Sequence, residues 1–590
     1  MNDRIVEYVR SLKPKDMPSG YDVLREGVEM GKNINVGRSL FLKEKGYKNY
    51  AEYKKEYAKQ GKITWEILLG LATLEEQVDA IKKIYEFSQR TGLEVSTVQC
   101  IPSSLMALPK EYRENAPKPT SYMFDKPQEW RAHQADVPME ILFEDQMLSC
   151  PNSLDTTINA LQCGSSRFGL VSQFIWGYPG FNDNKKHMID MIKSIGIMAS
   201  KRDEYIICDT YLDDGLPGYA MDCVTYVGYA LLEHYLVTDL CGARHQIAWG
   251  GLLSEGQTRL AVGLAIHKLL TTDDQPALSY INSSTIMQWD HDIEANYGPA
   301  IQEILLEALM ERKYKMNLTI NPVSITEKIA VPTLEDLLNI FSAGARSLER
   351  ISDWDDLMDW TPIEKIADRL AEEGKKFFNN VLEICETAGI NTKDPLEMFM
   401  MLKNMNPSKF EPTFHHNLDD SGSVRPFYPT VLGRQTLSMK DEVIDDLYKK
   451  GLTNKELDGT RMVCVSGDGH TYGLILVDAV YSEMGAEVVN GGVDIEPSVA
   501  LDLADEEGID VICISVHIGQ GLDYAKQIME LASKRNKKYH IYMGGMLNGI
   551  LPGGSVPVDI SDLMNETGVF ASNDLYESIS DIKRLQKGRQ

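Results

Sequence analysis

The sequence predicts an α/β protein whose chain folds as two successive parts. Short apolar runs alternate with amphipathic stretches from residue 60 to residue 405, a pattern typical of parallel strands joined by helices. The same alternation returns, more regularly, after residue 456. A turn-rich stretch separates the two regions. At 590 residues the chain is long enough for two domains, each with its own core.

The first part is predicted to span residues 1–404. Its first 60 residues are charged and helical in pattern, so we expect an N-terminal helical extension. Apolar runs at 93–98, 205–208 and 316–320 are predicted strands, and residues 73–81 have the pattern of a helix between strands. The length and the alternation favour a (β/α)8 TIM barrel as the catalytic and substrate-binding domain.

Residues 405–455 are predicted to be a connector between the two domains. The segments 406–409, 415–422 and 425–429 are rich in Pro, Asn, Asp and Gly, which are the residues that favour turns. We therefore expect this stretch to wrap between the domains without a helical core of its own.

The second part, residues 456–590, is predicted to be a flavodoxin-like, Rossmann-like domain. Its expected strands are residues 462–466, 487–490, 510–515, 539–543 and 568–571. Helical segments separate these strands, and five strands alternating with helices indicate a doubly wound parallel sheet. Sheets of this kind bind ligands beyond the carboxyl ends of their strands.

The amino-acid composition argues against some kinds of binding partner and some cellular locations. The net charge is −27, and an excess of carboxylates repels both phosphate backbones and anionic membrane surfaces, so we expect neither nucleic acid nor membrane as a partner. No apolar run is long enough for a transmembrane helix, and residues 1–7 lack the apolar core of a signal peptide. The nine scattered cysteines contain no C-x-x-C pair, which favours buried thiols in a cytoplasmic protein over disulfides or a zinc site.

Three short pieces lie at the ends of the first, third and fourth predicted strands of the second part. The first is Asp468-Gly469-His470-Thr471-Tyr472-Gly473, the second is Ser515-Val516-His517, and the third is Gly544-Gly545. Forty-one residues separate Gly473 from Ser515, and twenty-six separate His517 from Gly544. This layout resembles the domain that binds cobalamin with a histidine in place of its dimethylbenzimidazole tail under cobalt.

The side chains of these pieces suit that cofactor. His470 is the predicted cobalt ligand, and Asp468 can accept the N–H of the second ring nitrogen, which fixes the ring and raises its basicity. Gly473 lets the backbone lie close to the cofactor tail. Ser515 can hydrogen-bond the displaced benzimidazole, and Gly544 and Gly545 leave that strand end bare for a flat heterocycle.

The chain resembles the adenosylcobalamin-dependent mutases, and in particular the glutamate mutase group. His517-Ile518-Gly519-Gln520-Gly521 is similar to a segment of that group's small subunit, although His517 replaces a leucine. Shorter similarities to the group's barrel occur in the same order along the first part, at Trp176-Gly177-Tyr178-Pro179-Gly180-Phe181, Trp249-Gly250-Gly251, Met287-Gln288-Trp289, Glu327 and residues 419–425. The resemblance implies adenosylcobalamin as cofactor, Gly519 and Gly521 as further cofactor contacts, Glu327 as the ribose-binding residue, and a homo-oligomer.

The departures from the family concern the substrate. The positions expected for the family's roof arginine and for its ammonium-binding glutamate fall at Leu148 and Leu170, and its substrate tyrosine and a neighbouring lysine fall at Gly180 and Val323. A small dicarboxylate without an amino group would need no ammonium partner. 2-Methyleneglutarate, which rearranges to (R)-3-methylitaconate, fits this pattern.

The sequence does not identify the residues that would bind the carboxylates of the substrate. Arg131, Arg167 and Arg244 are candidates because guanidinium groups pair with carboxylates in bidentate fashion, although an arginine in such a position is more often an ordinary surface or structural residue. Trp176 and Tyr178 are candidates at the barrel mouth, or packing residues. Alternative functions are a mutase acting on glutamate or another small dicarboxylate, a corrinoid-dependent methyltransferase, and a cobalamin carrier without catalytic activity.

Overall fold

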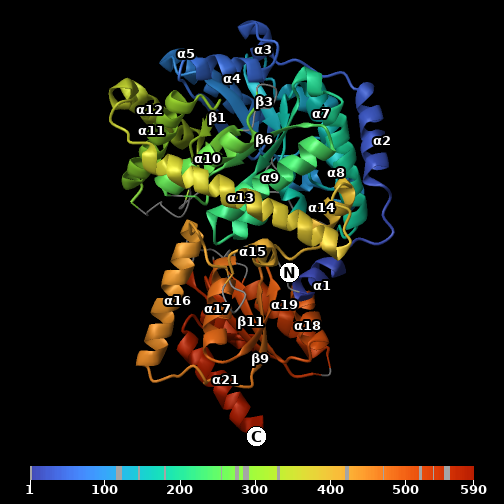
Figure 1. Ribbon diagram of the computed structural model, residues 1–590, viewed down its shortest axis with the longest axis vertical. Helices are drawn as coiled ribbons and strands as arrows, with labels where there is room; N and C mark the ends of the chain where they lie inside the picture. Colours follow the sequence, from blue (N-terminus) through green and yellow to red (C-terminus); the bar gives the residue numbers. More distant parts are fainter. Residues whose placement is uncertain are drawn as a thin grey trace. The chain divides into compact units, whose positions relative to one another are not determined.

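The computed structural model describes the chain as two compact units (Figure 1). Unit 1 comprises Met1–Met405 and Phe410–Val431, and unit 2 comprises Asn406–Lys409 and Leu432–Gln590. Within these units the described residues are 3–114, 122–143, 147–178, 181–253, 255–272, 278–282, 292–327, 332–418, 424–468, 471–493, 495–516, 521–535, 537–549 and 558–589.

Unit 1 is built on parallel strands that pair in chain order. The strands are β1 Thr64–Leu69, β2 Val95–Cys100, β3 Glu140–Phe143, β4 Arg167–Phe168, β5 Ile207–Tyr211, β6 Arg244–Trp249, β7 Leu278–Asn282 and β8 Thr319–Asn321. Each pairs with the next, and β8 pairs with β1, which closes the sheet. The structure confirms the predicted α/β class with parallel strands. Three predicted strands begin two to three residues too early, partly because Tyr205 has a left-handed φ of 63° that no strand accommodates.

Helices surround this sheet. They are α1 Asp3–Ser11, α2 Gly20–Lys32, α3 Leu40–Lys45, α4 Tyr50–Lys59, α5 Leu74–Thr91, α6 Pro127–Ala132, α7 Ser153–Cys163, α8 Asn184–Ala199, α9 Cys223–His234, α10 Gly256–Leu270, α11 Tyr297–Tyr314, α12 Leu334–Leu348, α13 Thr361–Ala388 and α14 Pro395–Lys403. The predicted helix at 73–81 is the first half of α5. A capping box between Thr73 and Glu76 begins this helix, and Gly92, with φ 73°, ends it.

The predicted connector contains two helices where turns were expected. Pro407 begins α15 Pro407–Phe414, since its fixed φ suits the first helical turn. The second helix, α16 Val431–Lys449, buries Ile444 and Leu447, which have helical spacing. The turn residues of 425–429 were therefore recognised, but the helix that follows them was missed.

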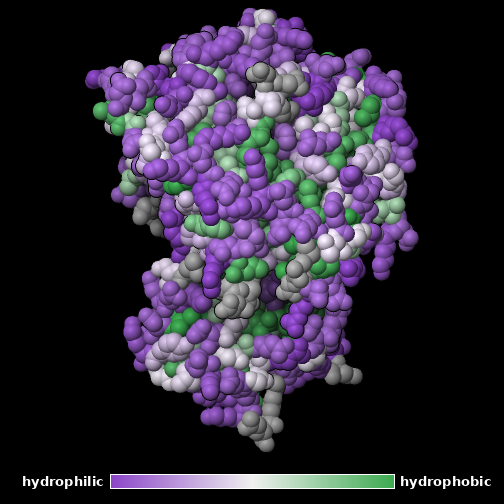
Figure 2. All heavy atoms as spheres, in the orientation of Figure 1, coloured by the Kyte–Doolittle hydropathy of each residue, from purple (hydrophilic) through white to green (hydrophobic). Residues whose placement is uncertain are grey.

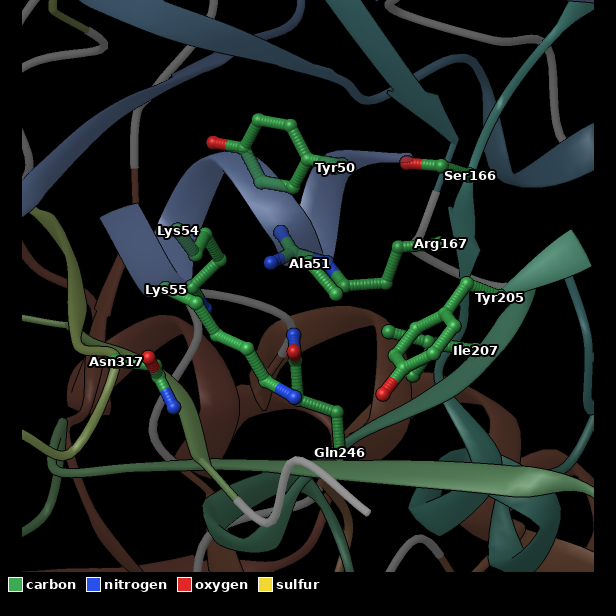
Figure 3. Close-up of a pocket in the computed structure, with 10 residues that line it drawn as sticks. All are labelled: Tyr50, Ala51, Lys54, Lys55, Ser166, Arg167, Tyr205, Ile207, Gln246 and Asn317. Carbon is green, nitrogen blue, oxygen red and sulfur yellow. The ribbon is translucent and has the colours of Figure 1, made fainter. Parts of the chain in front are cut away.

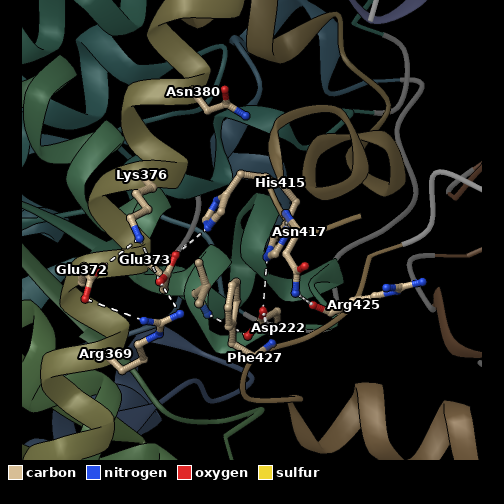
Figure 4. Close-up of polar contacts among 12 residues, drawn as sticks. Asp222, Arg369, Glu372, Glu373, Lys376, Asn380, His415, Asn417, Arg425 and Phe427 are labelled. Carbon is tan, nitrogen blue, oxygen red and sulfur yellow. Dashed lines mark hydrogen bonds and ion pairs between the residues drawn. The ribbon is translucent and has the colours of Figure 1, made fainter. Parts of the chain in front are cut away.

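The buried Asp222 carboxylate holds residues 415–418 and 424–430 within unit 1 (Figure 4). The Asp222 side chain, which has no solvent exposure, accepts hydrogen bonds from the backbone N–H of Phe427 (2.7 Å) and Tyr428 (3.1 Å) and lies 3.2 Å from His415 Nε2. The backbone N–H of Asn417 donates to His415 Nδ1, which leaves Nε2 as the ring nitrogen that donates to Asp222. The loop before α9 and the end of the segment are thereby held by one side chain.

Unit 2 is a five-stranded parallel sheet with helices on both faces. Its strand order is β10 Glu487–Gly492, β9 Arg461–Ser466, β11 Val511–Val516, β12 His540–Gly545 and β15 Phe570–Ala571. This is the flavodoxin-like order that the second part was predicted to have. Its further helices are α17 Thr471–Glu483, α18 Pro497–Glu506, α19 Gly521–Ser533, α20 Ser561–Glu566 and α21 Leu575–Arg589, and a short antiparallel pair joins β13 Asn548–Gly549 to β14 Val558–Asp559.

The two faces of this sheet differ in chemistry. Branched side chains such as Val465, Ile514 and Val516 pack with α18 and α19 in one apolar cluster. The opposite face meets α17 and α21, whose Tyr481 and Ser578 hydroxyls lie 3.0 Å apart. Because side chains alternate along a strand, Ser466 and Ser515 belong to this second face.

The polarity of the surface and the state of the cysteines match what the amino-acid composition predicted. The visible face of each unit is mostly hydrophilic, with scattered hydrophobic residues (Figure 2). Among the described residues, no helix has the length and apolarity required to cross a membrane. All nine cysteines are buried as thiols and none forms a disulfide, as predicted.

Replacing Asp222 by alanine tests this anchoring. The D222A change leaves the N–H groups of Phe427 and Tyr428 and the His415 ring without their hydrogen-bond acceptor. We therefore expect the free energy of unfolding of unit 1 to fall by about 3 kcal/mol or more. Urea unfolding followed by circular dichroism measures this. The control D355A removes an exposed partner of Arg312 and should cost about 1 kcal/mol or less. Equal losses in the two variants would contradict the account.

Candidate functional site

A row of small residues crosses the carboxyl edge of the unit 2 sheet. Ser515 on β11 is paired in register with Ser466 on β9 and with Gly544 on β12. In a parallel ladder, paired residues point to the same face, so all three lie on the face towards α17 and α21. Two residues earlier on each strand, the row on the same face of the sheet consists of Cys464, Cys513 and Tyr542. The sheet therefore offers a flat shelf without bulky side chains at its ligand-binding edge.

The Ser515 hydroxyl is a buried polar group without a hydrogen-bond partner among the described residues. The residue is 2% exposed, and its Oγ makes no hydrogen bond within the described part of the chain. An unsatisfied buried hydroxyl costs about 1–3 kcal/mol, so such groups normally meet a ligand or water. Its position in the small-residue row places this hydroxyl where the sequence predicted a contact with the cofactor tail.

Two glycines at this edge are required by close backbone approach. Gly545 has φ 106°, and a Cβ there would lie 2.4 Å from the Val516 carbonyl oxygen. A Cβ on Gly467, in the loop after β9, would lie 2.8 Å from the Tyr524 ring. Gly544 has more room, since its nearest neighbour would be the Ser572 carbonyl oxygen at 3.3 Å. Gly544 is thus the open position of the pair, and Gly545 forms the turn.

Other predicted cofactor residues lie around the same edge or outside the described residues. Asp468 is 4% exposed and follows β9, with Oδ1 3.5 Å from Ser466 Oγ. Thr471 and Gly473 belong to the first turn of α17, next to that loop. Gly521 begins α19 and packs against Met564 and Val516. His470, His517 and Gly519 lie outside the described residues, so their predicted roles stay predictions.

In unit 1, the carboxyl end of β6 carries a loop held by a buried aspartate. Asp213 Oδ2 accepts hydrogen bonds from the backbone N–H groups of Gly250 (2.8 Å) and Gly251 (3.2 Å), and its Oδ1 accepts one from the Tyr226 hydroxyl (2.9 Å). Burial raises the pKa of the Asp213 carboxyl. A Cβ on Gly251 would lie 2.0 Å from the Tyr211 hydroxyl, so any larger residue there would displace this hydroxyl. The sequence indicated the Trp249-Gly250-Gly251 segment but not the aspartate that fixes it.

The aromatic residues predicted at the barrel mouth lie beyond β4. Trp176 Nε1 donates to the Asp214 carbonyl oxygen (2.9 Å), which joins the loops after β4 and β5. Tyr178 is 8% exposed and packs in a small apolar cluster with Leu105 and Cys150, from the loops after β2 and β3. Both residues are therefore on the carboxyl side of the sheet, where ligands of parallel barrels bind.

Glu327 lies in the turn after β8, on that same side of unit 1. Its backbone N–H donates to the Ser324 carbonyl oxygen (3.2 Å), and its side chain is exposed. Partial desolvation nevertheless raises the pKa of its carboxyl group. Of the other barrel segments in the resemblance, Gly180, residues 287–289 and residues 419–423 lie outside the described residues.

The three arginines predicted as candidates for carboxylate binding occupy different places in unit 1, and the sequence could not tell these places apart. Arg167 is 2% exposed and pairs with Glu66 (2.6 Å) and Asp209 (2.7 Å) at the amino ends of the strands. Arg244 starts β6, also at the amino ends, with its guanidinium 3.7 Å from the centre of the Tyr205 ring. Arg131 is exposed on α6. The contacts of Arg167 and Arg244 are those of structural residues on the face opposite the ligand-binding side.

Comparison with known proteins supports cobalamin binding by unit 2. The family model described as "B12 binding domain" matches residues 460–555, which contain the small-residue row. A cobalamin-binding protein from Desulfitobacterium hafniense DCB-2, known from a crystal structure, is 16% identical, with 38% of this chain and 98% of that chain covered at a TM-score of 0.19. At that TM-score the likeness carries no structural argument. No curated protein matches the chain.

The residues present fit the cofactor that this match implies. The orphaned Ser515 hydroxyl and the bare Gly544 position share one edge with the buried Asp468 carboxylate. A planar heterocycle needs a flat surface with a hydrogen-bonding group, and the row provides this through its small residues and the Ser515 hydroxyl.

A larger side chain in the row of small residues should block binding of cobalamin. In S515L the added side chain crowds the row between Ser466 and Gly544, and we expect the affinity for cobalamin to fall about tenfold or more. Absorbance titration of the apoprotein with cobalamin measures the affinity. The matched control S498L changes an exposed serine on α18 and should bind normally. Normal binding by S515L would show that the tail does not use this row.

Proposed function

We propose that this chain is an adenosylcobalamin-dependent carbon-skeleton mutase that interconverts 2-methyleneglutarate and (R)-3-methylitaconate. The observation that carries the proposal is a cobalamin-binding domain joined on one chain to a unit of parallel β-strands whose carboxyl-side loops are held by buried polar contacts. We take unit 1 to be a catalytic (β/α)8 barrel. Glutamate mutase usually carries these parts on two subunits, whereas the methyleneglutarate enzyme carries them on one chain.

Residues of unit 2 would hold the cofactor. His470 would be the cobalt ligand, with Asp468 accepting the N–H of its other ring nitrogen so that the coordinating nitrogen keeps its lone pair. Ser515 would donate to the tail, and Gly544 would leave room for it. When bound, adenosylcobalamin supplies one-electron chemistry through homolysis of its cobalt–carbon bond.

Residues of unit 1 would receive the ribose and the substrate. Glu327 would accept hydrogen bonds from the ribose hydroxyls, for which the oxygens of an exposed carboxyl group are suited. Trp176 and Tyr178 would line the substrate site and exclude water. Leu170, at the position expected for the family's ammonium-binding glutamate, is buried and apolar, so it offers no ammonium partner, which supports a substrate without an amino group.

A corrinoid-dependent methyltransferase is the second candidate. Cobalamin domains of this class are preceded by a helical cap, and the turn-rich sequence before residue 455 argued against one. The helix α16, nineteen residues long, weakens that argument. The two candidates differ in their requirement for a methyl donor and acceptor.

Turnover separates these candidates. We expect purified protein with adenosylcobalamin, kept in the dark, to convert 2-methyleneglutarate to methylitaconate, as followed by proton NMR. Glutamate in a parallel reaction should stay unchanged. Turnover of glutamate alone would contradict the substrate assignment, and transfer of a methyl group from methylcobalamin to an added acceptor would favour the second candidate.

Replacing His470 tests the axial ligand. Protein labelled with ¹⁵N-histidine and loaded with cobalt(II) cobalamin should show hyperfine splitting from the labelled nitrogen in its EPR spectrum. We expect H470A to lose this splitting and its turnover, while H517N, which removes the other histidine of the motif, should keep the splitting. Splitting that persists in H470A would contradict the assignment.

A further inference from the structure

A small pocket lies at the amino end of the unit 1 strands, remote in the fold from the carboxyl-side loops described above (Figure 3). The helix α4 supplies Lys54 and Lys55, the start of β4 supplies Arg167, and β6 supplies Gln246. The enclosed space has room for one ion or water molecule. Figure 3 shows Lys55, Arg167 and Gln246 reaching towards the same space.

The Gln246 amide has a donor without an acceptor. The residue is 2% exposed, and its Nε2 makes no hydrogen bond within the described residues. The amide points into the pocket (Figure 3). An unsatisfied buried N–H group is costly, and it indicates that something in the pocket accepts a hydrogen bond.

The charged groups around the pocket favour an anion as that acceptor. Arg167 already pairs with Glu66 and Asp209, so its charge is partly balanced. Lys54, which is 4% exposed, has its pKa lowered to about 7, first by burial and next by the charge of Arg167, and against this Glu66, Asp209 and Glu311 raise it. Lys54 and Arg167 thus place two basic groups beside the pocket, and a bound anion would reduce the repulsion between their charges.

Two strained residues also line the pocket. Tyr205 has φ 63° and Asn317 has φ 61°, both in the left-handed region. Asparagine tolerates this conformation, but a bulky aromatic residue rarely adopts it. Residues held in such conformations concentrate at binding sites, where the surrounding structure holds them in place. The Arg244 guanidinium lies 3.7 Å and the Lys55 ammonium 5.9 Å from the centre of the Tyr205 ring, which adds to the positive character of this wall.

We propose that this pocket binds one small inorganic anion, which accepts hydrogen bonds from the Gln246 amide and from the cationic side chains around it. The site would tie α4 to the ends of β4 and β6, because its donors come from these three elements. The anion stabilises unit 1 and takes no part in the proposed reaction. Chloride suits the size of the space, and a small oxyanion such as phosphate presents the same chemistry with more oxygens.

Crystals of the full chain soaked in sodium bromide test the proposal directly. Bromide replaces chloride and gives an anomalous diffraction signal, so we expect a peak in the pocket within hydrogen-bonding distance of Gln246 Nε2. Phosphate at the same place in crystals grown from phosphate would identify the oxyanion as the occupant. Density with neither an anomalous signal nor tetrahedral shape would show that only water is bound, and this would overturn the proposal.

Thermal unfolding gives a second, independent readout. At constant ionic strength, exchanging gluconate for chloride or phosphate should raise the Tm of the wild-type protein by about 2 °C, because the anion binds the native state. The Q246M variant keeps the side-chain length but lacks the donor, so it should lose this rise. The control Q134M removes an amide that donates to the Cys163 carbonyl oxygen instead and should keep it. A wild-type Tm that is the same in all three salts would also overturn the proposal.

Discussion

The parallel register of β9, β11 and β12 is the constraint on which the cofactor site depends. It aligns Ser466, Ser515 and Gly544 in one row at the carboxyl edge, and it turns the branched side chains of the same strands towards α18 and α19. A slip of one residue would exchange the two faces, placing Ile514 or Val516 on the shelf and serine hydroxyls in the apolar cluster. The apolar cluster and the cofactor shelf therefore enforce the same register.

Buried carboxylates have a comparable role in unit 1. Asp213 fixes the glycine loop after β6, and Asp222 fixes residues 427–428 to the loop before α9. In both cases one side chain accepts backbone N–H groups from a segment distant in sequence. A carboxylate that receives several such bonds can stay buried without a basic partner, because the donors replace its lost hydration. The loops on the carboxyl side are held in this way, which gives the rigid support that the proposed catalytic site would need.

Most of the sheet order and of the cofactor edge could be predicted from the sequence, because both depend on local patterns. The apolar runs of unit 2 coincide with observed strands within two residues, and the motif residues Ser515 and Gly544 lie side by side at the predicted edge. The helix α16 was missed because the turn residues before it dominated the pattern. Asp213, Asp222 and Gln246 were missed because their partners are defined only by the fold. The role of Arg167 was open for the same reason, since Glu66 lies 101 residues away in sequence.

Hydrogen transfer between cofactor and substrate tests the proposed mutase most directly. The protein would be incubated in the dark with adenosylcobalamin and 2-methyleneglutarate deuterated at carbon, and the recovered cofactor would be analysed by mass spectrometry. A radical mutase predicts deuterium in the adenosyl group of the cofactor, together with labelled methylitaconate. Cofactor that binds to unit 2 yet returns without deuterium, under conditions where the substrate is present in excess, would contradict the account.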